Sequence, residues 1–193
     1  MALFVYTIVI VAGILADQIT KYLCVIDLPI DRSADVKIWE GVLHLRCISN
    51  DGAAFGMLDD KRWIFMTVSV VMIIVISVLL ILKHRSMSSL LNIALCLVVS
   101  GGIGNMIDRV ALGYVVDFIY FVPIDFPCFN VADSLVCIGA VLMFVSVLFF
   151  DGFDFEKFEA KKSAVAETPT VKEAQEDPPT PDICEAEEKE NDE

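Results

Sequence analysis

Two aspartates lie at the edges of apolar stretches in the second half of the chain. Asp117 closes the run Gly113–Asp117, and Asp133 precedes the uncharged run Ser134–Phe150. A chain that leaves a membrane and re-enters it on the same side brings both carboxylates to the same depth. Carboxylates that share an apolar site do not readily ionise together, so the pair tends to hold one proton. Such a pair suits aspartic-type peptide hydrolysis, in which one group activates water and the other protonates the carbonyl or the leaving amine.

Four long apolar stretches surround these residues. The chain of 193 residues is 56% hydrophobic and has a mean hydropathy of +0.69, which excludes an ordinary soluble domain. A span of about 20 apolar residues crosses a hydrocarbon core of about 30 Å. The sequence therefore predicts an α-helical membrane protein with four transmembrane helices. The uncharged runs are Ala2–Ala16, Trp63–Leu82, Leu90–Ile107 and Ser134–Phe150.

The first of these runs does not resemble a cleaved signal peptide. It lacks a basic n-region and continues through Asp17 and Lys21, so we expect it to remain in the mature protein.

Most of the acidic charge lies at the C-terminus. Residues 151–193 hold 15 acidic and 5 basic residues, and so carry −10 of the net charge of −13. From residue 160 onward there is scarcely a large apolar side chain, and such a composition cannot bury a core. We therefore expect a four-helix transmembrane domain over residues 1–150 and a mostly disordered acidic tail over residues 151–193.

The connection between the second and third apolar runs is short and basic, and contains Lys83, His84 and Arg85. The positive-inside rule places such a loop in the cytoplasm. This assignment puts both termini in the cytoplasm and residues 24–61 and 108–130 outside. Four basic residues in the first outer segment, and Arg62 directly after it, oppose the assignment.

The outer segments carry signs of local structure. Leu43–Cys47 alternates apolar and polar residues with a period of two, which predicts a half-buried strand, and Asn50-Asp51-Gly52 favours a turn. We expect a small antiparallel sheet that lies on the membrane surface. The stretch 118–127 is rich in aromatic residues and proline, and we interpret it as an interfacial loop.

Further polar residues lie near the predicted helix ends. Asp17 and Lys21 are four residues apart on one helix face, in the order that favours a salt bridge. They are either an interfacial ion pair or part of a site, because an aspartate at membrane depth usually faces the protein interior. Asn105, Asp108 and Arg109 share a face of the third helix. They either close that helix with a salt bridge and a polar cap, or orient a reactive carboxylate.

The start of the fourth helix has a purely structural explanation as well. Asn130 is a suitable N-cap, and Asp133 in the first turn would favour the positive end of the helix dipole. This alternative explains Asp133 taken alone. It does not explain why Asp17, Asp108 and Asp117 are predicted at the same membrane face.

Four motifs, in order, resemble those of lipoprotein signal peptidase (signal peptidase II), an aspartic peptidase family. With Gly139 included they cover residues 17–139, and their order among four predicted helices makes the resemblance specific. The motifs are Asp17-Gln18-x-x-Lys21, Asn50-x-Gly52-Ala53-Ala54-Phe55, Gly104-Asn105-x-x-Asp108-Arg109-x-x-x-Gly113-x-Val115-x-Asp117-Phe118 and Phe129-Asn130-x-Ala132-Asp133.

The resemblance implies a fold and an activity. The fold would be four transmembrane helices with a small extracytoplasmic antiparallel β-cradle. The activity would be that of a bacterial inner-membrane aspartic endopeptidase that cuts prolipoproteins before the diacylglyceryl-modified cysteine of the lipobox. Asp117 and Asp133 would form the catalytic dyad. Residues that shape or support the site would be Asp17, Lys21, Asn50, Gly52, Asn105, Asp108, Arg109, Asn130 and Ala132.

The resemblance also implies which partners to expect. They are diacylglyceryl-prolipoprotein substrates, membrane lipids and globomycin-type inhibitors, with no cofactor, no metal and no nucleic acid. We expect a monomer. The six cysteines show no metal-ligand spacing, and whether Cys47 and Cys128 pair is left open by the sequence.

Two other classes of protein compete with a peptidase. A transporter or proton-coupled channel would carry acidic residues through several helix midplanes, whereas here they cluster toward one face. A membrane scaffold without activity would tolerate Asp117→Asn or Asp133→Asn. A rhomboid-type serine protease is disfavoured because no suitable serine and histidine pair is present.

Overall fold

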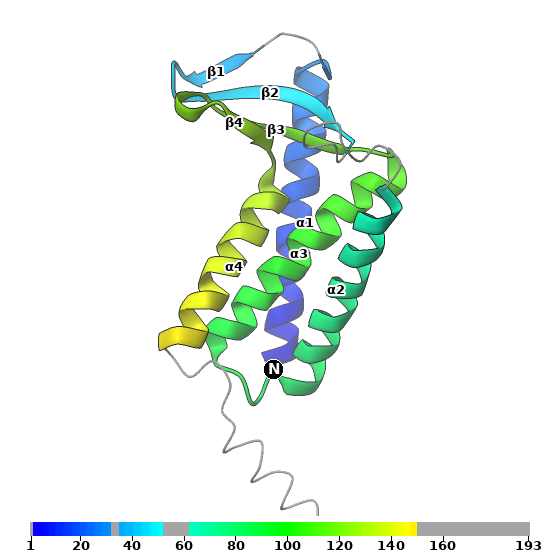
Figure 1. Cartoon of the computed structure of the whole chain (residues 1–193), viewed down its shortest axis with the longest axis vertical. Coiled ribbons are helices and arrows are strands. Elements are labelled where there is room, and N and C mark those ends of the chain that lie inside the picture. The colour runs from blue at the N-terminus through cyan, green and yellow to red at the C-terminus, as the bar shows by residue number, and fades with distance from the viewer. Residues whose placement is uncertain (1, 32–34, 52–61, 150–193) are drawn as a thin grey trace, which may run out of the picture.

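Four long helices and one small sheet make up the protein. The computed structural model describes residues 2–31, 35–51 and 62–149. The helices lie side by side, and the sheet covers one end of the bundle (Figure 1). The N-terminus and the connection between the second and third helices lie at the opposite end. The helices are α1 (Ala2–Asp27), α2 (Arg62–Lys83), α3 (Ser89–Ala111) and α4 (Val131–Phe149).

All four helices are long and apolar enough to cross a membrane, as predicted. The expected ends of α2, α3 and α4 are close to those observed, but α1 continues about one turn into the segment 24–61, to Asp27. Residues 24–27 contain no helix breaker, and the first proline of the chain is Pro29. The expected acidic tail lies outside the described residues.

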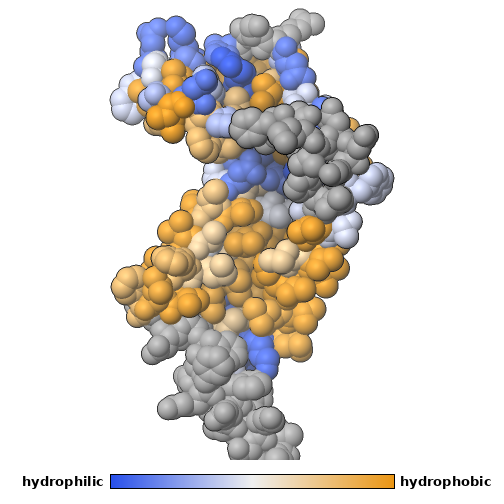
Figure 2. Space-filling view, viewed as in Figure 1, coloured by the Kyte–Doolittle hydropathy of each residue, from blue (hydrophilic) through white to orange (hydrophobic). Residues whose placement is uncertain are grey.

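The surface of the helices is apolar where a lipid bilayer would contact them. Figure 2 shows a broad hydrophobic band over the bundle, with hydrophilic atoms toward the sheet. Large side chains point outward along α1 and α2, such as Phe4 at 71% exposure and Leu82 at 70%. A water-soluble protein would bury such side chains, so these faces indicate contact with lipid.

Helix α3 is the central, buried helix, and it packs against α1, α2 and α4. Two glycines permit the close approach. A Cβ atom on Gly101 would lie 2.3 Å from the carbonyl oxygen of Ala132 in α4, and one on Gly104 would lie 2.6 Å from a carboxylate oxygen of Asp17 in α1. The glycines therefore bring polar groups of α1, α3 and α4 together at the sheet end of the bundle.

The sheet has four antiparallel strands in the order β1-β2-β3-β4. They are β1 (Val36–Trp39), β2 (Leu43–Asn50), β3 (Val115–Phe121) and β4 (Phe126–Phe129). The predicted strand at residues 43–47 and the small antiparallel sheet are confirmed. The expectation of a loop over residues 118–127 is wrong. That stretch forms most of β3, a short 3-10 helix η2 (Val122–Ile124) and part of β4.

The reason for this error lies in how β3 is covered. Its residues 115–118 are all buried, so no alternation of apolar and polar residues marks the strand. Both of its edges are paired, to β2 and to β4. Its β-branched and aromatic residues are nevertheless typical of a strand.

A small apolar core fixes the sheet to the bundle. It joins the end of α1 to one side of β2 and β3. Its buried members are Cys24, Leu28, Cys47, Val116 and Phe118. Cys47 and Cys128 are both free thiols, so the structure shows no bridge between these two residues.

Candidate active site

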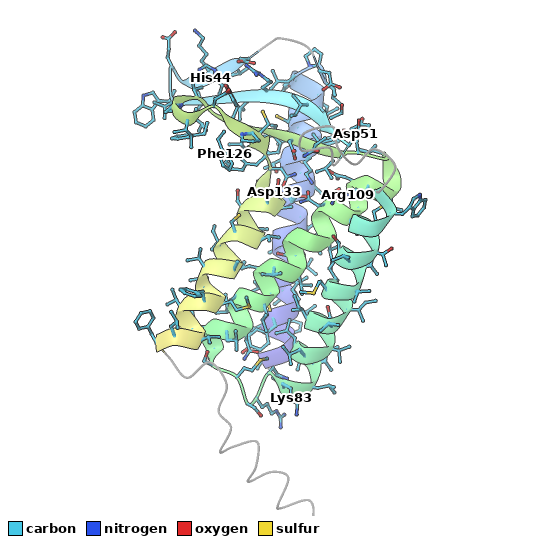
Figure 3. All side chains as sticks on the ribbon, viewed as in Figure 1. His44, Asp51, Lys83, Arg109, Phe126 and Asp133 are labelled. Carbon is cyan, nitrogen blue, oxygen red and sulfur yellow. The ribbon has the colours of Figure 1, made fainter. Side chains whose placement is uncertain are left out.

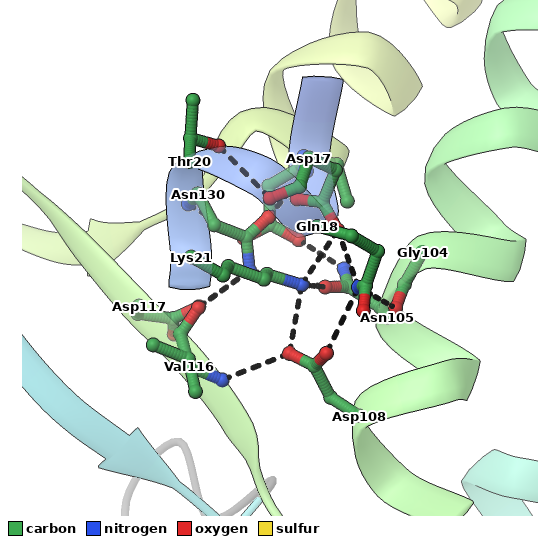
Figure 4. Close-up of polar contacts among 12 residues, drawn as sticks. Asp17, Gln18, Thr20, Lys21, Gly104, Asn105, Asp108, Val116, Asp117 and Asn130 are labelled. Atoms are coloured by element: carbon green, nitrogen blue, oxygen red, sulfur yellow. Dashed lines mark hydrogen bonds and ion pairs between the residues drawn. The ribbon is translucent and has the colours of Figure 1, made fainter. Parts of the chain in front are cut away.

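A buried ion-pair cluster lies where α1 and α3 meet beneath the sheet (Figure 4). The ammonium of Lys21 lies 2.9 Å from Asp17 Oδ2 and 2.8 Å from Asp108 Oδ2. All three residues are buried. The i,i+4 pair predicted from the sequence is therefore confirmed, but it lies inside the protein and not at an exposed interface. Because burying a charge is costly without partners, this cluster holds α1 and α3 in one alignment.

The two carboxylates of this cluster also bind backbone N–H groups of neighbouring elements. Asp17 Oδ1 accepts a hydrogen bond from the Ala132 N–H at 2.8 Å, in the first turn of α4. Asp108 Oδ2 accepts one from the Val116 N–H of β3 at 3.1 Å. The first N–H groups of a helix have no partner within that helix, so Asp17 supplies one from another helix.

Gln18 is a member of the cluster that the predicted site set does not contain. Its amide nitrogen donates to Asp108 Oδ1 at 3.0 Å, to Asp17 Oδ2 at 3.2 Å and to the Gly104 carbonyl at 3.2 Å. Gln18 lies three residues before Lys21, and therefore on the same helix face. That spacing is the sequence feature that could have identified it.

Two asparagines connect this cluster to the predicted pair. Asn105 Oδ1 accepts hydrogen bonds from Lys21 Nζ and from Asn130 Nδ2, both at 3.0 Å. Its own Nδ2 then points the other way and donates to Asp133 Oδ1 at 2.8 Å. The charge of Lys21 thus fixes which end of the Asn105 amide faces Asp133.

Asp117 lies on β3 and is 1% exposed. Asn50 Nδ2 donates to its Oδ2 at 2.7 Å, and Asn130 Nδ2 donates to its Oδ1 at 2.6 Å. Burial raises the pKa of this carboxyl to about 6, and the charge of Asp133 adds to the increase, while the two amide donors oppose it. A carboxyl with this pKa exchanges its proton near neutral pH.

Asp133 lies in the first turn of α4 and is partly exposed. Its N–H donates to Asn130 Oδ1 at 2.9 Å, and its Oδ2 accepts from the Asn130 N–H at 3.2 Å. This reciprocal pair is a capping box, so the predicted cap at Asn130 is confirmed. Because Asn130 also binds Asp117, the helix cap and the link between the two carboxylates are the same residue.

The other predicted residues lie at different distances from the pair. Asp17, Lys21 and Asp108 form the layer behind Asn105, while Ala132 contributes its backbone. The Arg109 guanidinium donates to the Asn105 carbonyl of its own helix at 3.4 Å, and within the described part of the chain it makes no bond to Asp117 or Asp133. Gly52 lies outside the described residues.

The site therefore consists of two carboxylates of different exposure, oriented by amides and supported by a buried ion-pair layer. It lies in the recess between the sheet and the apolar band of the bundle, where Figure 2 shows hydrophilic atoms, and Figure 3 labels Asp133 at that level. Among the described residues, no group of three or more His, Cys, Asp or Glu side chains is placed to hold a metal ion. The fold and site define a multi-pass membrane protein with two linked aspartates at one end of its helix bundle.

Comparisons with known proteins agree with this class. The family model described as "Signal peptidase (SPase) II" matches residues 9–149. A lipoprotein signal peptidase of Bacillus velezensis is 38% identical over 149 residues, which are 76% of this chain and 95% of that protein. A lipoprotein signal peptidase of Lactococcus lactis is 38% identical over 141 residues, with 73% and 91% covered.

Solved structures share the architecture. One, described as a bacterial membrane enzyme at 1.9 Å resolution, superposes with a TM-score of 0.67 at 30% identity and covers 76% of this chain and 94% of its own. A second bacterial membrane enzyme, at 2.3 Å, gives a TM-score of 0.66 at 28% identity, with 87% and 94% covered. The chain belongs to the signal peptidase II family.

Proposed function

We propose that the chain is an aspartic endopeptidase in which Asp117 and Asp133 hydrolyse the bond between a signal peptide and a prolipoprotein. Its family membership already makes it a signal peptidase that removes signal peptides from prolipoproteins. The observation that carries the aspartic mechanism is the link through Asn130, which donates to both carboxylates while burial raises the pKa of Asp117.

The mechanism uses one proton shared between the two carboxyl groups. The ionised member accepts a proton from a water molecule, and the resulting hydroxide adds to the scissile carbonyl carbon. The protonated member donates its proton to the carbonyl oxygen, which gives a neutral tetrahedral intermediate. Collapse of the intermediate breaks the C–N bond as a proton passes to the leaving amine. The two groups titrate as a pair, so neither is assigned alone as the base.

The neighbouring amides serve to hold this pair in place. Asn105 and Asn50 each donate to one carboxylate, and Asn130 donates to both. Preorganised donors of this kind need no rearrangement during the reaction. Lys21, with Asp17 and Asp108, supports Asn105 from behind. We assign these residues positioning roles, and we extend such roles to Arg109, Ala132 and Gly52 from the family resemblance.

The test is cleavage of a diacylglyceryl-modified prolipoprotein by purified protein in detergent. Asp117→Asn and Asp133→Asn should each lower the rate by at least about a hundredfold, because positioned acid–base groups contribute that much. Asp125→Asn is the matched control. Asp125 is an exposed carboxylate with a φ of 49°, a conformation that asparagine tolerates, and it lies outside the site. Near-normal rates for both dyad variants, with normal thermal unfolding, would refute the aspartic mechanism and leave transport or a structural role.

The location of the site follows from the basic connection between α2 and α3. We propose that the protein lies in the bacterial inner membrane as a monomer, with both termini cytoplasmic and the sheet outside. The cleaved bond would then be the one before the lipid-modified cysteine, and globomycin-type peptides would compete at the same pair. An epitope tag at the C-terminus tests the orientation. It should resist protease added to intact spheroplasts and be lost after lysis, whereas digestion in intact spheroplasts would contradict the assignment.

A further inference from the structure

The outer part of one sheet face, beyond Asp117, is apolar across all four strands. Residues that pair across antiparallel strands point to the same side of a sheet. The pairings define two consecutive rows in which every side chain is apolar. The row nearer Asp117 contains Val36, Leu45, Ile119 and Phe129, and the row farther from it contains Trp39, Leu43, Phe121 and Phe126.

At the outer end of the sheet, away from the core around Val116 and Phe118, the opposite face is polar. The row between the two apolar rows contains Lys37, His44 and Tyr120. The Arg46 guanidinium lies 4.5 Å from the Tyr120 ring centre and binds Asp35 through two hydrogen bonds of 2.7 Å. Figure 3 shows His44 and Phe126 on opposite sides of the sheet, with Phe126 on the side toward the helices.

The outer apolar row is exposed in the protein itself. Trp39 is 67% exposed, Phe126 47% and Phe121 36%, and Ile124 in the adjoining η2 is 68% exposed. We call these four residues the sheet patch. Single exposed apolar side chains are common, but a contiguous group that includes three aromatic rings indicates a contact surface.

We propose that the sheet patch is a membrane-docking surface that rests in the interfacial layer of the bilayer. Three observations favour lipid as its partner. The strands that carry it extend past the start of α4 (Figure 1), and Phe126 lies on the side of the sheet toward the helices (Figure 3). The sheet patch contains no charged residue, while the charged Lys37 and Arg46 lie on the other face of the sheet. Aromatic side chains are also those that membrane interfaces favour.

Docking would set the height of the site relative to the membrane. Phe121 and Asp117 lie on the same strand and the same face, four residues apart. Because β3 is rigidly paired on both edges, a fixed depth for Phe121 sets a depth for Asp117 close to the lipid headgroups. The inference goes beyond peptide hydrolysis and holds whether or not Asp117 is catalytic.

Tryptophan fluorescence provides the test, because the chain contains two tryptophans, Trp39 and Trp63. The Trp63→Phe variant makes Trp39 the reporter. The full-length variant is reconstituted without substrate into bilayers of plain lipid or of lipid brominated near the headgroup end of its acyl chains. The matched control combines Trp63→Phe, Trp39→Phe and Lys37→Trp, which places the reporter two residues away on the polar face.

We expect brominated lipid to lower the emission of Trp39 about twofold or more, because interfacial apolar groups lie about 5–10 Å into the headgroup boundary. The Lys37→Trp control should be unaffected by bromine and strongly quenched by aqueous acrylamide. Trp39 emission that responds to acrylamide and not to bromine would overturn the proposal. Quenching that appears only after a lipid-modified peptide is added would assign the patch to substrate. Shielding from acrylamide that disappears on dilution of protein in lipid would assign it to a second copy.

Discussion

The hydrogen bond from Asn50 to Asp117 allows the proposed proton sharing to be tested by a shift in pH dependence. Asn50 Nδ2 donates to Asp117 Oδ2 at 2.7 Å, which favours the ionised carboxylate and so lowers its pKa. Asn50→Leu keeps the branched shape and removes this donor. A hydrogen bond to a charged group contributes about 1.5–3 kcal/mol, and one pKa unit corresponds to about 1.36 kcal/mol. The pKa of Asp117 should therefore rise by about one to two units from its value of about 6.

The assay is kcat/KM for a lipid-modified prolipoprotein peptide as a function of pH. The reaction needs one proton on the pair, so activity falls as pH rises through the higher pKa of the pair. Removing the Asn50 donor makes the carboxyl hold its proton to higher pH, and the alkaline limb should move upward by about one to two units.

Ser49→Ala is the matched control for this prediction. Ser49 precedes Asn50 in β2, and its hydroxyl donates to Asp31 at 2.6 Å. Removing the Ser49 hydroxyl deletes a hydrogen bond made from the same strand but leaves Asp117 and Asp133 unchanged. The alkaline limb of the pH profile should therefore stay at its wild-type position. An alkaline limb in Asn50→Leu that stays in place or moves to lower pH would refute the reasoning.

Three further predictions concern the wild-type profile and the packing around the site. Wild-type kcat/KM should be at least about tenfold lower at pH 8 than at pH 6, because a raised carboxyl pKa of about 6 loses the shared proton over that range; a flat profile would argue against a catalytic proton there. Lys21→Met should lower the unfolding free energy by about 3–5 kcal/mol, because it leaves two buried carboxylates without their cation; in thermal unfolding it should differ clearly from Lys37→Met, which removes only an exposed ion pair that contributes little to stability. Gly101→Ala should lower the free energy of unfolding by about 1–3 kcal/mol, since the added Cβ would lie 2.3 Å from the Ala132 carbonyl oxygen. Gly102→Ala should be close to neutral in stability, because its Cβ would lie 3.1 Å from the side chain of Ile73. Equal losses of stability in the two variants would contradict the packing argument.

The helices and much of the site were predictable because their causes are local. A lipid environment requires each spanning segment to satisfy its own backbone, so an uncharged run of about 20 residues indicates a helix directly. The Asp17–Lys21 pair follows from the helical repeat, and the cap at Asn130 follows from residue type and spacing. All three are present in the structure.

Strands β3 and β4 were not predictable in this way. The side chains of β3 are covered on both faces in its first half, which removes the alternation that identifies a strand. Its partner β2 lies about 70 residues earlier in the chain, and the pairing between them depends on the whole fold. The same pairing brings Asn50 to Asp117, a contact that neither segment indicates by itself.

By itself, the sequence determined the membrane class, the four spanning helices and the residue types available for chemistry. These depend on hydrophobicity and on spacing within one element, and both are written in consecutive residues. Only the tertiary structure decided which groups meet. Gly101 and Gly104 let α3 approach its neighbours, Lys21 orients the Asn105 amide, and burial on β3 gives Asp117 its raised pKa. Those properties depend on distances between segments far apart in the chain, because electrostatic and packing energies depend on separation in space and not on separation in sequence.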